Sequence, residues 1–504
     1  MKNRFTILIT LTLSYITCFS QTYVNCGAEY MPDTIAAINA PFEMPQLRRP
    51  VFNEYKIKIN KFGARQTGNC TKSIQKAIDH VSMKGGGTVV VPAGKWLCGR
   101  LELKSNVNLH IEENAELHFS GNIKDYLPVV FTRIEGVELY SLGACIYANG
   151  ANNIAITGKG KIVGPTADCE IYKHHVNSSA LEDVVAKTFP VENRKYDGTG
   201  DITAFLPMTF APVSCNNVFV EGITITKTIF WNIVPQYCNN VIIRGVTVNS
   251  HGMGRTDGID IESTSNVLIE YSTLDCGDDC FTIKSGRGYD GLRVNIPSSN
   301  IVIRNSIAKR GAGGVTCGSE TAGMINNLYV HDCIFESPTH GFYFKTRRTR
   351  GGGARNLYFE RITMKNPRIA YKWDMLGSSQ WVGKLAERLP KRDITPVTPY
   401  YENMFFKDIT IENCKKVMDF KGIPETPITQ VRIDNMKIKK SSDLIYIRDV
   451  DGMIVTNSDI TSSSNIIEMT GSRNVMFINT TFNILNNKIN TIYTDKESLP
   501  ILFR

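Results

Sequence analysis

The sequence lacks any long hydrophobic run after residue 20. A membrane-spanning helix needs about 20 consecutive apolar residues, and no later stretch of the chain reaches that length. We therefore expect no insertion into a membrane.

Blocks of like charge are also missing, as is any motif that interleaves basic and aromatic residues. Such features are typical of nucleic-acid-binding segments, so we expect no nucleic-acid partner. Lys and Arg number 57 against 48 Asp and Glu, which gives a net charge of +9. This excess permits attraction of an acidic polymer.

Cysteine is sparse, with 13 in 504 residues and no paired CxxC motifs that would indicate zinc. Twelve remain if Cys18 is removed with a leader peptide, and an even number allows disulfides. Cys276 and Cys280, in the segment DCGDDC, could pair. An isolated CxxxC motif is weak evidence for a disulfide. We therefore expect Cys276 and Cys280 to be small apolar residues packed near a core.

The first 20 residues have the layout of a secretory signal peptide. Lys2 and Arg4 precede an apolar run from Phe5 to Phe19, and the small residue Ser20 follows. We expect cleavage before Gln21 and export to the periplasm or the extracellular space.

One pattern recurs through most of the chain: a residue, usually Asn, followed by about eight residues that alternate apolar and polar. These segments begin at Asn106, Asn153, Asn217, Asn240, Asn266, Asn300, Asn327, Asn356, Asn403, Gln430, Gly452 and Asn474. Starts at 217 and 240 lie 23 residues apart, and those at 430, 452 and 474 lie 22 apart. Alternation with a period of two predicts strands with one buried face. Repetition at this interval predicts a solenoid.

Leucine-rich and propeller signatures are absent, so a parallel β-helix fits best. We expect an all-β, single-stranded parallel β-helix with Val, Ile, Leu and Phe inside and polar side chains outside. It would span residues 55–504, after the signal peptide at 1–20 and an N-terminal extension at 21–54.

The segment TKSIQKAIDHVSM, from Thr71 to Met83, is the clear candidate for an amphipathic helix. Because exposed strand edges invite aggregation, we expect this helix to cap the N-terminal end of the solenoid. Longer excursions interrupt the repeats at roughly 165–205, 285–299 and 376–401. Loops of that length on a regular scaffold are often functional walls or lids.

Acidic residues gather when four consecutive repeats are aligned by their strands. The aligned segments are TDGIDIES from Thr256, DDCFTIKS from Asp278, AGGVTCGS from Ala312 and THGFYFKT from Thr339. In this register Asp257 lies over Asp279, with Gly313 and His340 in the same column. Three carboxylates, counting Asp278, therefore meet on two neighbouring turns of the solenoid.

Crowded carboxylates suit the hydrolysis of a glycosidic bond. One carboxyl must stay protonated to donate to the leaving oxygen, and another must be ionised to act on water or on the sugar. Repulsion raises the pKa of one member. One turn of separation could place two carboxyl groups ~6.5–9.5 Å apart, as in an inverting glycosidase. The ~5 Å separation of a retaining glycosidase is also compatible with the sequence. A calcium site and a polar turn are the alternatives.

The sequence resembles the polygalacturonase family, glycoside hydrolase family 28. The resemblance spans most of the mature chain, and its most specific segments are TDGID from Thr256 and GDD from Gly277, which continues to KSGR at Lys284. It implies a right-handed parallel β-helix that hydrolyses pectin, an acidic plant polysaccharide, without metal or cofactor. A monomer is expected.

By position, the resemblance makes Asp278 the general acid, with Asp257 and Asp279 positioning and activating the attacking water to give inversion. Lys345 matches the lysine of the family's Arg-x-Lys motif and would bind a galacturonate carboxylate. Arg287 and Glu320 are further candidates for substrate contacts in the cleft.

Three positions depart from the family pattern. Arg255 stands where the family has Asn, Ala312 where it has His, and Tyr343 where it has the substrate-binding Arg. His340 could replace the lost imidazole. These contacts surround the leaving-group sugar, which in rhamnogalacturonan can be rhamnose, a sugar without a carboxylate. The chain could therefore act on rhamnogalacturonan rather than on homogalacturonan. It could also act on chain ends.

Two rival functions stay open at this point. One is a calcium-dependent pectate lyase on a similar solenoid. The other is a non-catalytic β-solenoid that only binds polysaccharide, which the changes at Ala312 and Tyr343 make conceivable.

Overall fold

The computed structural model describes residues 25–504, except 177–178, 188, 485 and 487. The predicted signal peptide lies outside these residues. None of the helices in the described part of the chain is long and apolar enough to cross a membrane.

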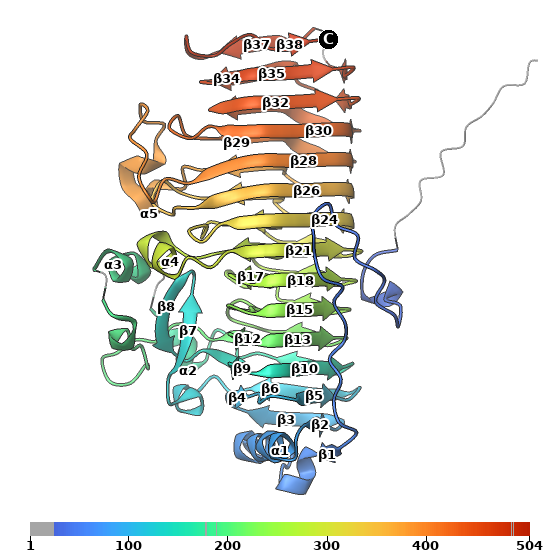
Figure 1. Cartoon of the computed structure of the whole chain (residues 1–504), viewed down its shortest axis with the longest axis vertical. Helices are drawn as coiled ribbons and strands as arrows, with labels where there is room; N and C mark the ends of the chain where they lie inside the picture. The colour runs from blue at the N-terminus through green and yellow to red at the C-terminus, as the bar shows by residue number, and fades with distance from the viewer. Residues whose placement is uncertain (1–24, 177–178, 188, 485, 487) are drawn as a thin grey trace, which may run out of the picture.

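The chain folds as a parallel β-helix, as the repeat predicted (Figure 1). One sheet contains 24 strands. They are β1 Lys56–Lys58, β2 Gly87–Val91, β3 Gly94–Cys98, β5 Val107–Ile111, β6 Ala115–Phe119, β10 Asn152–Gly158, β11 Lys161–Val163, β13 Asn216–Glu221, β14 Thr224–Thr226, β15 Asn239–Arg244, β16 Thr247–Asn249, β18 Ser265–Glu270, β19 Thr273–Asp275, β21 Ser298–Arg304, β22 Ile307–Arg310, β24 Ile325–Phe335, β26 Gly353–Met364, β28 Tyr400–Ile411, β30 Ile428–Ile438, β32 Val450–Thr456, β33 Asp459–Thr461, β35 Arg473–Ile478, β36 Thr481–Asn483 and β38 Leu502–Phe503.

A second, nine-stranded sheet carries the acidic repeats. Its strands are β17 Ile259–Glu262, β20 Phe281–Lys284, β23 Gly313–Cys317, β25 His340–Lys345, β27 Ile369–Asp374, β29 Cys414–Lys421, β31 Ser441–Arg448, β34 Ile466–Thr470 and β37 Asn490–Tyr493. A three-stranded sheet comprises β4 Leu101–Glu102, β9 Ala144–Asn149 and β12 Met208–Val213.

Helices and one hairpin interrupt the turns of the solenoid, here called rungs. The antiparallel hairpin joins β7 Val130–Ile134 to β8 Val137–Ser141. The short helices are α2 Glu170–Lys173, α3 Ala180–Lys187, α4 Gly288–Val294 and α5 Ser379–Val382. Figure 1 shows the hairpin and these helices on the same side of the molecule, away from the 24-stranded sheet.

Helix α1 spans Thr71–Met83, the residues that the periodicity predicted, and lies at the N-terminal end of the stack (Figure 1). Its buried residues Ile74, Ile78 and Val81 pack against the first rungs.

The Asn that opens a repeat has a left-handed backbone, with φ between 53° and 62° at the Asn positions from 106 to 474. Asn tolerates this conformation better than most residues with a side chain. The side chains also bond from rung to rung: Asn153 Nδ2 donates to Asn106 Oδ1 at 3.0 Å, and Asn217 Nδ2 donates to Asn153 Oδ1 at 2.9 Å. Gly452, with φ of 95°, takes the same place in a later rung.

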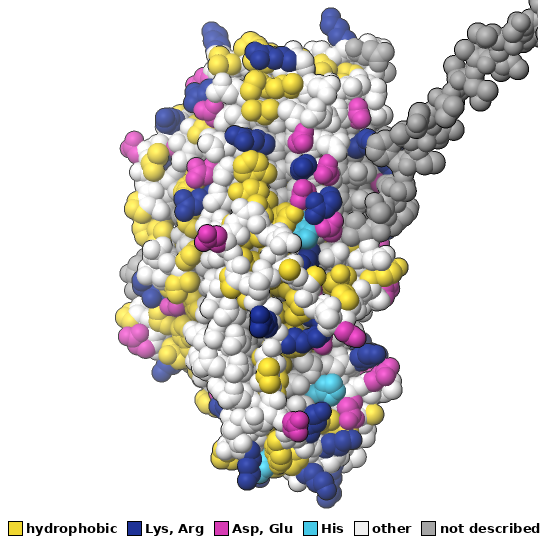
Figure 2. All heavy atoms as spheres, turned by 45° about the vertical axis from the view of Figure 1, so that its right-hand side comes forward, with side chains coloured by type: hydrophobic (Ala, Val, Ile, Leu, Met, Phe, Trp, Pro, Cys, Tyr) yellow, Lys and Arg dark blue, Asp and Glu magenta, His cyan; other side chains and the backbone are white. Residues whose placement is uncertain are grey.

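The expectation of a polar exterior is wrong for the 24-stranded sheet. A column of apolar residues faces outward from successive rungs: Ala155, Phe219, Ile242, Leu268, Val302 and Tyr329. Residues 25–54 run along this column and bury it with Ile38, Leu47 and Phe42 (Figure 1). In Figure 2, hydrophobic side chains continue as a strip in the upper half of the molecule.

Two buried arginines fasten this N-terminal extension. Arg244 Nη2 donates to Pro32 O at 2.6 Å, and Arg304 Nη2 donates to Ala36 O at 2.8 Å. Both guanidinium groups also pair with the buried Glu270 carboxylate. The extension is therefore part of the packed structure rather than a free tail.

The twelve cysteines in the described residues are free thiols. Cys276 and Cys280 are fully buried and pack in the main core. They therefore behave as small apolar residues, as the sequence favoured.

Candidate active site

Strand pairing confirms the predicted register of the acids. Ile259 pairs with Phe281, and Phe281 pairs with Val315, so Asp257 falls in the column of Asp279 and Gly313. The backbone bond from Gly258 N to Asp279 O, 2.9 Å long, ties the two rungs together beside the acids. The column continues to His340, which pairs with Gly313.

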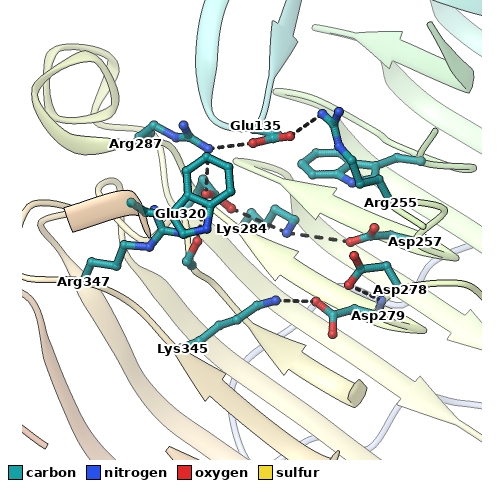
Figure 3. A pocket seen from close by; sticks show the side chains of 13 residues that line it. Glu135, Arg255, Asp257, Asp278, Asp279, Lys284, Arg287, Glu320, Lys345 and Arg347 are labelled. Carbon is teal, nitrogen blue, oxygen red and sulfur yellow. Dashed lines mark hydrogen bonds and ion pairs between the residues drawn. The ribbon is translucent and has the colours of Figure 1, made fainter. Parts of the chain in front are cut away.

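The acids line a pocket of about 210 Å³ (Figure 3). Its lining residues come from the nine-stranded sheet, from the loops that precede or follow its strands, and from the inserted segments. They are Glu135, Trp231, Arg255, Asp257, Asp278, Asp279, Lys284, Arg287, Ser319, Glu320, Lys345, Arg347 and Trp381.

All three predicted excursions reach this region. Arg287 belongs to the excursion at 285–299 and Trp381 to that at 376–401, and both line the pocket. Glu182 in α3, from the excursion at 165–205, pairs with Arg287 and Arg350.

The three aspartates are close together and largely withdrawn from water. Asp257 is 3% exposed and Asp279 is fully buried, whereas Asp278 is half-buried. Each offers a carboxylate oxygen within 4.8 Å of the others. The closest oxygens are therefore nearer to one another than the ~6.5–9.5 Å expected for an inverting pair.

Burial and repulsion act together on two of these acids. Burial and the charge of Asp279 raise the pKa of Asp278 above its ordinary value. Burial and the charges of Asp260 and Asp278 raise the pKa of Asp257 well above it. Protons are thus held in the cluster at pH values where an exposed aspartate is ionised.

Asp279 has the opposite tendency. Burial alone would raise its pKa, but the ammonium groups of Lys345 and Lys284 lower it below the ordinary value. Lys345 Nζ donates to Asp279 Oδ2 at 2.7 Å. Adjacent residues in the chain therefore differ in charge state, which is what paired acid and base roles require.

Lys284 is a buried cation among carboxylates. Its Nζ lies 3.9 Å from Asp257 Oδ2, 3.6 Å from Asp260 Oδ1 and 3.5 Å from Glu320 Oε2. It also lies 4.6 Å from the centre of the Trp231 ring. Trp231 is 4% exposed, and its ring also stacks on Phe230 with centroids 5.1 Å apart.

Arg287 and Glu320, both predicted to contact substrate, line the pocket but form ion pairs with other residues of the protein. Arg287 Nη2 lies 3.2 Å from Glu320 Oε1 and 2.8 Å from Glu135 Oε2. Both side chains are about 5% exposed or less. Their charges are largely compensated before any substrate binds.

Tyr343 and His340, also predicted to bind substrate, lie beside the pocket rather than in its lining. Their rings contact each other with centroids 4.3 Å apart. His340 Nδ1 is 2.9 Å from Ala312 O, and burial lowers the pKa of the imidazole to about 4. The His340 ring is therefore neutral near pH 6 and offers no cation to a sugar carboxylate.

Glu135, Ser319 and Trp381 line the pocket but were not predicted from the sequence. Glu135 and Gly136 join two alternating runs, VFTRI and VELYS, and both have positive φ, 45° and 82°. Two such residues between alternating runs are a hairpin signal, so the turn was recognisable. Its position over the acids was not, because it depends on contacts with distant segments.

The three aspartates could also offer oxygen ligands to a cation. Two ammonium groups already stand among these oxygens, Lys345 on Asp279 and Lys284 near Asp257. A divalent cation would have to bind against their repulsion. The arrangement therefore suits acid–base chemistry better than calcium binding.

Comparison with known proteins gives consistent matches. The family described as glycosyl hydrolases family 28 matches residues 197–372. A probable polygalacturonase of Vitis vinifera is 25% identical over 392 residues, which cover 75% of this chain and 72% of the relative. An exo-poly-alpha-D-galacturonosidase of Dickeya chrysanthemi is 28% identical over 335 residues, 62% of this chain and 55% of that one.

Among solved structures, a hyperthermoactive exopolygalacturonase from Thermotoga maritima superimposes with a TM-score of 0.67 at 27% identity. The match covers 89% of this chain and 93% of that one. The inserted segments around the pocket are therefore carried on a scaffold that the two proteins share.

Proposed function

We propose that this chain hydrolyses galacturonosyl linkages in the backbone of pectin, because glycosyl hydrolases family 28 matches residues 197–372 and the relatives named above are polygalacturonases. The observation that carries the proposal is the acid cluster, in which Asp278 and Asp279 adjoin but have opposite pKa shifts. The names of the relatives, which refer to polygalacturonan, support this substrate class. The match to a hydrolase family favours hydrolysis over the lyase and over the purely binding solenoid.

In the proposed reaction, Asp278 donates its proton to the glycosidic oxygen as the bond to the anomeric carbon breaks. Asp279, kept ionised by Lys345, and Asp257 hold a water molecule, and Asp279 accepts its proton as the water oxygen bonds to that carbon. Asp257 Oδ1 is a buried oxygen that accepts no hydrogen bond from the described residues, so a water molecule bound in the cluster would satisfy it. Attack from the face opposite the leaving group, with inversion of configuration, is carried over from the family resemblance, since the oxygen spacing by itself does not give it.

We also propose action at chain ends. Glu135, on the hairpin turn, and Trp381, in α5, both line the pocket and come from inserted segments. Walls of this kind, around a pocket of about 210 Å³, suit a terminal sugar better than a chain running through an open groove. Exo-acting names among the relatives agree with this proposal.

One observation favours rhamnogalacturonan as a second candidate substrate. On the side of Lys345, the family's cationic contacts are replaced by Ala312 and Tyr343, and Lys345 itself is paired with Asp279. That side would accept a neutral leaving-group sugar with little loss. Export, inferred from residues 1–20, would bring the enzyme to either polymer.

The test is chromatography of products from defined oligosaccharides of polygalacturonate and of rhamnogalacturonan. The proposal predicts saturated monosaccharide released from one end of at least one series. Random internal cutting would contradict end action. No cleavage of either series would contradict the proposed function.

A further inference from the structure

Arg255 is the most exposed of the described arginines that line the pocket. It stands two residues before Asp257, with a left-handed backbone at φ 60°. Its guanidinium carbon lies 4.9 Å from the centre of the Phe230 ring, and its side chain is 31% exposed. Nη2 donates to Glu135 Oε1 at 2.6 Å, while Nε and Nη1 bond to no described residue.

Glu135 holds this guanidinium from a separate part of the chain (Figure 3). Its second oxygen accepts from Arg287 Nη2 at 2.8 Å, so one carboxylate bridges two arginines. Burial would raise the pKa of Glu135, but Arg287 and Arg255 keep it below its ordinary value. Glu135 is therefore ionised and fixes the orientation of Arg255.

The remaining cations of the pocket are more fully paired or more buried than Arg255. Lys345 donates to Asp279, Lys284 lies among three carboxylates, and Arg287 pairs with Glu135 and Glu320. Arg347 donates no hydrogen bond to a described residue, but it is only 15% exposed, lies 3.6 Å from Glu182 Oε1 and stacks on Trp381, with its guanidinium carbon 5.5 Å from the ring centre. Arg255 therefore has the most accessible unpaired donors of the described pocket arginines.

Arg255 and Lys345 also lie on opposite sides of the acids. The rung order runs from Asp257 through Asp279 to Gly313 and then to strand β25, which carries Lys345. Figure 3 shows the aspartates between the two cations. A sugar near Arg255 would therefore sit across the scissile bond from a sugar near Lys345.

We propose that Arg255 binds the carboxylate of a galacturonate on the side of the acids away from Lys345, and that Glu135 is its positioning residue. A planar guanidinium with two free donors matches a carboxylate. This inference rests on the proposed function and adds the residue that selects a uronic acid at this place. An Asn here, as in the family pattern, would carry no charge for that purpose.

Binding of galacturonate and of galactose by calorimetry tests this assignment without requiring turnover. The two sugars differ in a carboxylate. Wild type should bind galacturonate about 10- to 100-fold more tightly than galactose. Arg255→Gln should lose most of that preference while its galactose affinity stays the same. Arg255→Lys should recover part of it.

Glu135→Gln should weaken galacturonate binding by about 3- to 10-fold, with galactose again unaffected, because the guanidinium loses its anchor. Arg310→Gln is the matched control, since Arg310 is 52% exposed, pairs with Asp275 and is not part of the pocket lining. It should behave as wild type. Thermal midpoints of all variants separate loss of binding from loss of folding.

Equal affinity of wild type for the two sugars would overturn the proposal, as would an unchanged preference in Arg255→Gln. Equal losses for both sugars in Arg255→Gln would show that Arg255 only supports Phe230 and the hairpin. Failure of wild type to hydrolyse any galacturonosyl oligosaccharide would instead contradict the proposed function, since the binding preference is measured separately.

Discussion

Asp278 and Asp279 are neighbours in the chain, yet their carboxyl groups meet different surroundings. Asp279 is fully buried against Lys345, whereas Asp278 faces the pocket and is half-buried. Repulsion between the two carboxylates favours a state in which they hold one proton between them. The positive charge of Lys345 stabilises ionised Asp279, so the proton resides on Asp278. The role of each acid therefore follows from its contacts and not from its place in the DCGDDC segment.

Asp278→Asn tests the assignment of the proton donor. An amide keeps the shape of the side chain but cannot protonate a leaving oxygen, so kcat should fall by about 10²- to 10⁴-fold. Binding of galacturonate should persist, and the thermal midpoint should stay or rise because one repulsive charge is gone. Unchanged turnover would show that another group is the acid.

Lys345→Met tests the base. Removing the ammonium leaves Asp279 without its nearest positive charge, so the pKa of Asp279 should rise. Activity requires ionised Asp279, so the acid limb of the kcat/KM profile should move to higher pH, by about one unit or more.

Lys372→Met is the control for that profile, because Lys372 is buried and paired with Asp419 at 2.5 Å but is not part of the pocket lining. Its acid limb should match that of wild type. If Lys345→Met leaves the acid limb in place, Lys345 does not set the charge of Asp279.

Among the elements, the β7–β8 hairpin has the most direct influence on the pocket. Its turn places Glu135 between Arg255 and Arg287, and Gly136 O accepts from Arg287 N at 3.1 Å. A Cβ on Gly136 would lie 2.8 Å from Glu320 Cγ and 2.9 Å from Arg287 N. The turn can approach the sheet this closely because it contains glycine.

Gly136→Ala should therefore displace the hairpin and raise KM by about 10-fold through Glu135. Gly150→Ala is the matched control, because Gly150 also has positive φ, 65°, but open space around it. Both variants should lose about 1–2 kcal/mol of stability from backbone strain. Equal KM values would show that the hairpin does not position the site.

The elements also show how far the sequence alone could lead. Alternation and the repeated Asn predicted the strands, their order and the column of Asp257 and Asp279, because a solenoid repeats one local environment. The hairpin contacts and the bridge from Glu135 to Arg255 join segments about 120 residues apart. No repeat encodes such contacts, so the motif residues were found and their charged partners were missed.

At the scale of the whole molecule, the N-terminal extension closes an apolar column that the repeat pattern would otherwise leave in water. Ile38 is 5% exposed and packs against that column, on a different sheet from the one that carries the acids. The extension therefore bears on stability and not on chemistry.

Ile38→Ala should cost about 2–4 kcal/mol of unfolding free energy while leaving kcat unchanged. Val51→Ala, in the same extension but at a side chain that is 88% exposed, should cost almost nothing. Thermal or denaturant unfolding measures both. Equal losses of unfolding free energy in the two variants would show that Ile38 does not contribute to a hydrophobic core.

Hydrolysis by the three aspartates is tested most directly by cleaving a galacturonate oligosaccharide in water enriched in heavy oxygen, followed by mass spectrometry of the first products. We expect saturated products in which the sugar released from the broken bond carries one heavy oxygen at its new hydroxyl, with the configuration at that carbon inverted. Unsaturated products without the label would contradict this expectation.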